Sequence, residues 1–162
     1  MRIAISGHRG LPAATERLID QAIRDHLARY ATSDRIVGIS ALADGADQIF
    51  ARAVLDLGGQ LEVIVPASRY RDGLPESAHD TYDALLSAAA AVDRLGYVES
   101  TEDAHMAASR AMLDTADNLF AVWDGEPARG YGGTADVVAE ALQRAIPVTV
   151  IWPEGASRDQ AA

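Results

Sequence analysis

Residues 119–145, LFAVWDGEPARGYGGTADVVAEALQRA, decide the fold class. The segment opens with a short apolar run, residues 119–123, which is typical of a buried strand, and it closes with apolar residues at helical spacing. A glycine-rich turn, residues 124–134, joins the two. Glycine lets the main chain approach a ligand closely, and a helix N-terminus adds unpaired N–H donors and the positive end of a dipole. The segment therefore predicts a strand–turn–helix unit that can bind a phosphate.

A second glycine turn follows the first apolar run of the chain. Residues 2–6, RIAIS, lead into Gly7-His8-Arg9-Gly10 and then into a helical pattern. Arg9 can pair with a phosphate or a carboxylate, and His8 can donate to the same group or stack against a base. The alternative is that both are solvated loop residues. Two glycine turns at strand ends predict an anionic ligand the size of a nucleotide.

The rest of the chain alternates in the same way between strand and helix patterns. Strands are predicted at Arg2–Ser6, Arg35–Ile39, Gln60–Val65, Ala91–Val98, Asn118–Trp123 and Pro147–Trp152. Helices are predicted at Pro12–Tyr30, Gly45–Leu57, Glu76–Ala89, Glu102–Thr115 and Thr134–Ala145. We therefore expect an α/β, three-layer Rossmann-like fold, with a doubly wound, mainly parallel sheet of about six strands and helices on both faces. Ligands of such sheets bind beyond the carboxyl ends of the strands, where the winding direction reverses.

The composition is that of one globular domain. The 162 residues are 49% hydrophobic, yet no apolar run is long enough to cross a bilayer. We expect a single nucleotide-binding domain over residues 1–153 and a flexible polar tail over residues 154–162. The chain has no cysteine, and its four histidines form no recognisable metal-ligand pattern, so we expect a cytoplasmic protein without a bound metal.

The net charge of −10 bears on the partners. Binding of a long polyanion depends on a cationic surface, so the charge leads us to expect no nucleic-acid partner. A small phosphate ligand needs only a local group of donors. Arg9 and Arg129 are the basic residues nearest the two glycine turns.

Aspartates near the turns have competing interpretations. Asp44 can cap the second helix or accept from ribose hydroxyls, whereas capping alone explains Asp47. Asp124 can contact a ribose or orient Arg129. Asp136 lies in the first turn of the last helix, where the helix dipole by itself favours a carboxylate.

Three stretches together carry a family resemblance. SGHRG at residues 6–10, ADGAD at 43–47 and NLFAVWDGEPARGYGGTADVV at 118–138, followed by AIPVTVIWP, resemble the SLOG superfamily of Rossmann-like proteins. That superfamily includes the LOG phosphoribohydrolases, DprA-type DNA-processing proteins and YpsA-like proteins. The resemblance implies an AMP-like or ADP-ribose-like ligand across the first, second and fifth strand ends, with its phosphate on residues 132–134. It also implies a homodimer or a higher homo-oligomer.

The chain departs from the phosphoribohydrolases at their hydrolytic residue. Their pattern is proline, two glycines, a variable residue, glycine-threonine, two further residues and a glutamate. Here Gly133 and Thr134 match the glycine-threonine pair, so Val137 occupies the position of the glutamate. Asp136 is adjacent, but one residue turns a helical side chain by about 100°. We therefore expect a ligand-binding protein such as a sensor. The alternative is an N-glycosidic hydrolase or transferase that acts on a nucleoside 5′-phosphate.

The expected site residues lie in the turns after three strands. Under the enzymatic alternative, Asp136, Asp124 or Asp44 would stabilise the developing ribosyl cation. Three histidines, His26, His79 and His105, fall in helical patterns and are assigned no role. The expected ligand-binding residues are Gly7, His8, Arg9, Asp44, Gly45, Asp124, Gly125, Gly130, Gly132, Gly133 and Thr134.

Overall fold

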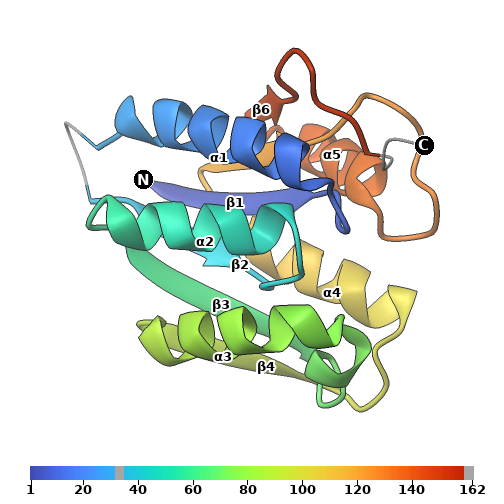
Figure 1. The fold of residues 1–162 in the computed structure, drawn as a ribbon. Helices are drawn as coiled ribbons and strands as arrows, with labels where there is room; N and C mark the ends of the chain where they lie inside the picture. Colours follow the sequence, from blue (N-terminus) through green and yellow to red (C-terminus); the bar gives the residue numbers. More distant parts are fainter. Residues whose placement is uncertain (32–34, 159–162) are drawn as a thin grey trace.

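The computed structural model describes residues 1–31 and 35–158, and within them six parallel strands form one sheet in the order β4-β3-β2-β1-β5-β6 (Figure 1). The predicted α/β Rossmann-like fold is confirmed. The strands are β1 (Arg2–Gly7), β2 (Val37–Ser40), β3 (Gln60–Ala67), β4 (Ala91–Tyr97), β5 (Asn118–Val122) and β6 (Val148–Ile151). The helices are α1 (Ala13–Ala28), α2 (Ala46–Asp56), α3 (His79–Ala88), α4 (Glu102–Leu113) and α5 (Thr134–Gln143), with short 3-10 turns at Arg71–Gly73 and Glu76–Ala78.

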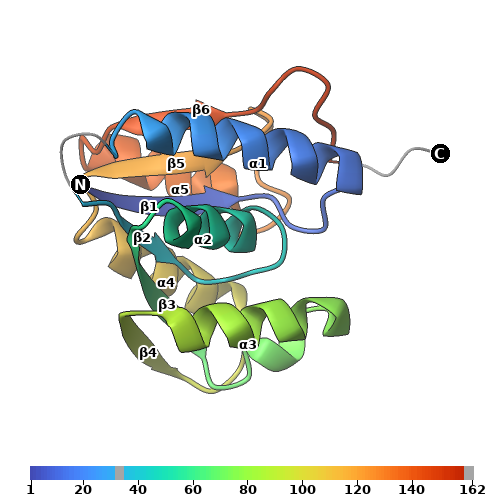
Figure 2. The ribbon, with the colours of Figure 1, turned by 60° about the vertical axis from the view of Figure 1, so that its left-hand side comes forward.

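Helices cover both faces of the sheet (Figures 1 and 2). Alternate side chains of a strand point to opposite faces, so β1 contributes Ile3 and Ile5 to one core and Ala4 to another. The Ile3 side packs with α1 and α2, and the Ala4 side packs with α4 and α5. A third cluster joins α3 to β3.

The winding direction reverses between β1 and β5. The chain builds the sheet outward from β1 to β4, and it then returns to pair β5 with the free side of β1, with Ile5 opposite Phe120 and Gly7 opposite Val122. A side chain at Gly7 would collide with Ala46 at the start of α2 and would lie 2.8 Å from Val122 Cβ. Glycine at this position therefore allows β1, β5 and α2 to meet at the switch point.

Strand β4 differs from the other strands. It is an edge strand, and six of its seven residues are exposed, among them the charged Asp93 and Arg94. Strand β5, next to the centre of the sheet, is buried throughout. The apolar pattern that indicates a doubly covered strand therefore holds for β5 and fails for β4.

The segment after β6 packs against the start of α1. The Thr15 hydroxyl donates to the Ser157 carbonyl at 2.8 Å and accepts the Ser157 N–H at 3.0 Å. Residues 159–162, the end of the expected flexible tail, lie outside the described residues, as do residues 32–34. Within the part of the chain that the structure describes, no helix has the length and apolar character needed to cross a bilayer.

Candidate functional site

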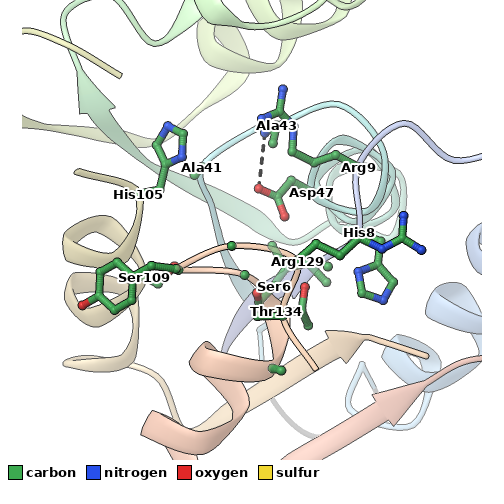
Figure 3. Close-up of a pocket in the computed structure, with 18 of the residues that line it drawn as sticks. Ser6, His8, Arg9, Ala41, Ala43, Asp47, His105, Ser109, Arg129 and Thr134 are labelled. Atoms are coloured by element: carbon green, nitrogen blue, oxygen red, sulfur yellow. Dashed lines mark hydrogen bonds between the residues drawn. The ribbon is translucent and has the colours of Figure 1, made fainter. Parts of the chain in front are cut away.

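A cavity of about 390 Å³ opens at the carboxyl end of the sheet, beside the switch point (Figure 3). Its walls come from the end of β1, the loops after β2, β3 and β5, and the facing parts of α4 and α5. The structure brings most of the predicted glycine-turn residues into these walls. The predicted residues that line the cavity are Gly7, His8, Arg9, Gly130, Gly132, Gly133 and Thr134.

The N-terminus of α5 forms one wall. Gly132 has a φ of +85°, and the Gly133 N–H donates to the Gly130 carbonyl at 3.2 Å, which closes the glycine turn. Thr134 and Ala135, the first two residues of α5, line the cavity, and their N–H groups have no acceptor among the described residues. These two donors are therefore available to an anion at the positive end of the helix dipole.

Asp136 organises the glycine turn and does not line the cavity. Its Oδ2 accepts the Gly132 N–H at 2.9 Å, so this N–H, which we expected to face a phosphate, already has a partner. Val137, which stands at the position of the hydrolytic glutamate, is buried in the core between α5 and the sheet. Neither side chain therefore lines the cavity.

His8 links the ends of β1 and β5. Its Nε2 lies 3.1 Å from the Asp124 backbone nitrogen and 3.2 Å from Asp124 Oδ1. Burial, helped by the positive charge of Arg158, lowers the pKa of His8 below its ordinary value, although Asp124 acts in the opposite direction. The imidazole is therefore neutral near pH 7, and Nε2 accepts the Asp124 N–H in preference to pairing with the carboxylate. His8 thus helps to build one wall of the cavity.

Asp124 and Gly125 shape the start of the loop after β5 but do not line the cavity. Asp124 Oδ1 accepts the Glu126 N–H at 3.0 Å in an Asx turn, and Gly125 has a φ of +83°. Burial raises the pKa of Asp124, but the Glu126 N–H, His8 and Arg158 outweigh that effect and the net shift is downward. Asp124 is consequently an ionised structural residue of this loop.

Asp44 and Gly45 connect the loop after β2 to the loop after β1. Asp44 Oδ1 pairs with Arg9 Nε at 2.8 Å, and its Oδ2 accepts the Gly10 N–H at 3.0 Å. The N-cap residue of α2 is Gly45, with a φ of +87°, and an added Cβ there would lie 2.6 Å from the His8 carbonyl oxygen. Asp44 therefore neither caps α2 nor lines the cavity. It orients Arg9 through an ion pair made outside the cavity wall.

Three arginines line the cavity although the chain as a whole is acidic. Arg9 follows β1, Arg129 lies in the loop after β5, and Arg158 is the last described residue. Arg158 reaches the site because the segment after β6 folds back, which places its guanidinium 3.6 Å from Asp124 Oδ2. Sequence reasoning missed Arg158, since nothing local in a short polar segment indicates that distant contact.

Further residues in the walls were not predicted as site residues. Asp47 is buried at 8% exposure, and its Oδ2 accepts the Ala43 N–H at 3.3 Å. Burial raises the pKa of Asp47 to about 7. His105 packs edge-on against the Tyr70 ring at 5.6 Å and shares a hydrogen bond of 2.7 Å with the Ser100 hydroxyl. The ADGAD stretch was a usable signal for Asp47, whereas the helical pattern around His105 gave none.

No protein-family model matches the sequence, and no curated protein matches it. Solved structures match its fold. DprA from Streptococcus pneumoniae has 16% identity and a TM-score of 0.66, and the match covers 95% of this chain and 51% of that one. This chain therefore spans about half the length of the pneumococcal protein. DprA from Helicobacter pylori has 17% identity and a TM-score of 0.66, with 97% and 68% of the two chains covered.

A third match is a molybdenum cofactor binding protein from the phototrophic bacterium Rippkaea orientalis. It has 15% identity and a TM-score of 0.58, and the match covers 92% of this chain and 74% of that one. The chain shares the Rossmann-like fold of these proteins. At these identities the likeness concerns the fold alone, and the solved structures that share the fold are described as binding different ligands, single-stranded DNA or the molybdenum cofactor.

The expectation that excluded a nucleic-acid partner is wrong. The Helicobacter pylori DprA structure, which has the same fold, is described for its binding of single-stranded DNA. The expectation rested on the net charge of the whole chain, whereas association with phosphates depends on the local distribution of charge. Three arginines around one cavity are compatible with a net charge of −10.

Proposed function

We propose that this protein binds a nucleotide or a nucleotide-derived ligand in the cavity at the switch point, with a phosphate at the N-terminus of α5. One observation carries the proposal: the first residues of α5, whose N–H groups lack acceptors among the described residues, share a cavity with Arg9, Arg129 and Arg158. Backbone donors and guanidinium groups are the two kinds of partner that phosphates most often have in proteins.

The size and lining of the cavity support this ligand class. About 390 Å³ falls within the range of small-molecule pockets. Away from the glycine turn the walls include Pro66, Tyr70 and Met112, which offer apolar and aromatic surface for a base. A ligand with a charged end and a flat, weakly polar end fits both parts.

The two carboxylates predicted as catalytic do not support hydrolysis. Asp124 and Asp136 each accept a backbone N–H of the turn after β5, and neither lines the cavity. A carboxylate that stabilises a ribosyl cation must lie next to the sugar. The positions of these two residues thus favour a sensor or carrier of the ligand over the predicted hydrolase.

The experiment is thermal unfolding of the protein with AMP, GMP, CMP, NAD, ADP-ribose and a short single-stranded oligonucleotide, followed by an assay for released base. A ligand at one hundred times its dissociation constant stabilises the folded state by about 2.7 kcal/mol. We expect a shift in melting temperature with at least one of the mononucleotides or dinucleotides and no released base. Free base would show a hydrolase, and a shift with the oligonucleotide alone would replace the small ligand with single-stranded DNA.

A proline variant tests the phosphate position. Thr134→Pro removes one of the two N–H groups at the first helical position, where proline fits, and the preceding Gly133 already has the extended ψ of 174° that proline requires. We expect roughly tenfold weaker binding of a phosphorylated nucleotide. Ala13→Pro makes the same change at the exposed start of α1 and should leave affinity unchanged. Equal affinities in the two variants would show that the phosphate lies elsewhere.

A further inference from the structure

We propose that Asp47, which lines the cavity together with Tyr70, accepts a hydrogen bond from an N–H group on the base of the ligand. This proposal rests on the nucleotide-binding function proposed above. It assigns a specificity-determining role to a residue that local sequence explains only as a helix cap.

The Asp47 carboxyl is buried but incompletely partnered. Its side chain lines the cavity, and Oδ2 accepts one rather long hydrogen bond, 3.3 Å, from the Ala43 N–H. Oδ1 has no hydrogen-bond partner among the described residues. Among the described residues, every polar side-chain atom that is fully inaccessible has a hydrogen-bond partner. Because Oδ1 has none, it is not fully inaccessible, and the cavity is the space that its side chain lines. A carboxyl oxygen in this position lacks a donor that a ligand could supply.

Among the described residues, no cation forms an ion pair with Asp47. The charged and titratable groups that face it are Arg9, Asp44 and Tyr70, and Arg9 Nε is already paired with Asp44 at 2.8 Å. The described residues form no ion pair with Asp47, and the buried Tyr70 hydroxyl is uncharged at neutral pH. A ligand donor would therefore be a favourable partner for the ionised carboxyl.

The surroundings of Asp47 suit a flat ring. Tyr70 and His105 meet edge-on at 5.6 Å, and both line the cavity together with Pro66 and Met112. In Figure 3, Asp47 lies between His105 on one side and Ser6 and Thr134 on the other. A nucleotide whose phosphate lies at Thr134 can thus extend its base towards Asp47.

The test is calorimetric titration at pH 8 with AMP, GMP and purine riboside 5′-monophosphate, whose base carries no N–H donor. For the wild-type protein we expect the better of AMP and GMP to bind roughly tenfold more tightly than purine riboside 5′-monophosphate. This discrimination should disappear in Asp47→Ala and should be smaller at pH 6 than at pH 8, because protonation weakens the acceptor. Asp103→Ala, on the exposed face of α4, is the control and should retain the discrimination.

Each outcome separates the two proposals. Equal wild-type affinities for the three nucleotides, with clear binding, would overturn the role of Asp47 and leave the proposed function intact. Equal discrimination in Asp47→Ala and in wild type would do the same. The same titrations are made with the three nucleosides, adenosine, guanosine and purine riboside. If the nucleosides reproduce the discrimination and bind as tightly as their monophosphates, the proposed phosphate site is wrong and the role of Asp47 stands. If none of the six compounds binds, both proposals are overturned.

Discussion

The loops after β2 and β5 share a local sequence but use it differently. Each contains Asp-Gly, at residues 44–45 and 124–125, and both glycines have a positive φ. In both loops the first aspartate accepts a backbone N–H, from Gly10 or from Glu126. The loops diverge at the next aspartate along the chain.

That second aspartate faces the cavity in only one of the two loops. Asp136 does not line the cavity and accepts the Gly132 N–H at 2.9 Å, whereas Asp47 lies in the cavity wall and one of its oxygens has no partner among the described residues. The contrast shows that an aspartate near a strand end is not by itself a ligand residue. It becomes a candidate only where the backbone of its own loop leaves an oxygen accessible from the cavity.

The largest effect should distinguish the two Asp-Gly glycines. In Gly45→Ala the new Cβ would lie 2.6 Å from the His8 carbonyl oxygen, and residue 45 has a backbone conformation that only glycine readily adopts. We therefore expect a loss of at least about 3 kcal/mol of stability. At Gly125 a Cβ meets nothing within 4 Å, so Gly125→Ala should cost only about 1–2 kcal/mol, for its positive φ. Urea unfolding measures both, and equal losses would contradict the structural difference between the loops.

The second effect concerns the pH dependence of stability at Asp47. Its pKa is raised from 3.8 to about 7 in the folded state, so the unfolded chain releases this proton at lower pH. The contribution of Asp47 to the free energy of unfolding is therefore fully present below pH 3.8 and is lost as the pH rises to 7. The loss is about 1.4 kcal/mol for each unit of difference between the folded and unfolded pKa.

Asp47→Asn removes this titration. The difference in free energy of unfolding between Asp47→Asn and wild type should consequently move in favour of the variant from pH 4 to pH 8. Urea unfolding at several pH values measures that difference. A difference that does not change with pH would mean that the Asp47 carboxyl is well hydrated in solution.

The third effect concerns the arginine that Asp44 orients. Arg9→Ala removes one guanidinium from the cavity wall, and we expect binding of a phosphorylated nucleotide to weaken by roughly 1.5–3 kcal/mol, with little change for the nucleoside. Arg17→Ala is the control, because Arg17 lies on α1 outside this cavity. Calorimetric titration compares the variants. An equal loss for nucleotide and nucleoside would remove the phosphate role of Arg9.

The smallest effect tests Asp136 as a structural residue. Asp136→Ala leaves the Gly132 N–H without its acceptor, so we expect a loss of roughly 0.5–2 kcal/mol of stability. Asp103→Ala also removes an acidic side chain from a first helical turn. The Asp103 side chain accepts no hydrogen bond from the described residues, so the loss of stability should be smaller. Thermal unfolding compares the two variants. A larger loss in Asp103→Ala would contradict the turn-organising role of Asp136.

The fold could be predicted because its determinants are local. Short apolar strands alternate with amphipathic helices, and each predicted element is present, with boundaries that differ by a few residues at most. Parallel topology then brings the ends of β1, β2 and β5 together, which is why turns far apart in the sequence, such as those of Arg9 and Gly132, line one cavity. The exposure of β4 was harder to anticipate, because it depends on which strand occupies the edge.

The site could be predicted only in part. Glycine turns reveal where the backbone can approach a ligand, but not which of its N–H groups the protein itself uses, as Asp136 and Gly132 show. His105 and Arg158 reach the cavity through long-range packing that no local pattern encodes. Asp47 does accept a backbone N–H, but from Ala43 and not from Asp44, the N-cap of the predicted capping box. Its burial beside the cavity also distinguishes it from an ordinary cap.

The contact of the final described segment with α1 and with Asp124 has a consequence for the order of synthesis. A nascent chain can assemble β1 to β5 on the ribosome before residues 157 and 158 emerge, but it then lacks Arg158 in the cavity wall and the Ser157 contact with Thr15. The cavity wall is therefore completed only after residue 158 has been synthesised. Products that stop after β6 would retain most of the sheet while lacking Arg158, one of the arginines that line the cavity.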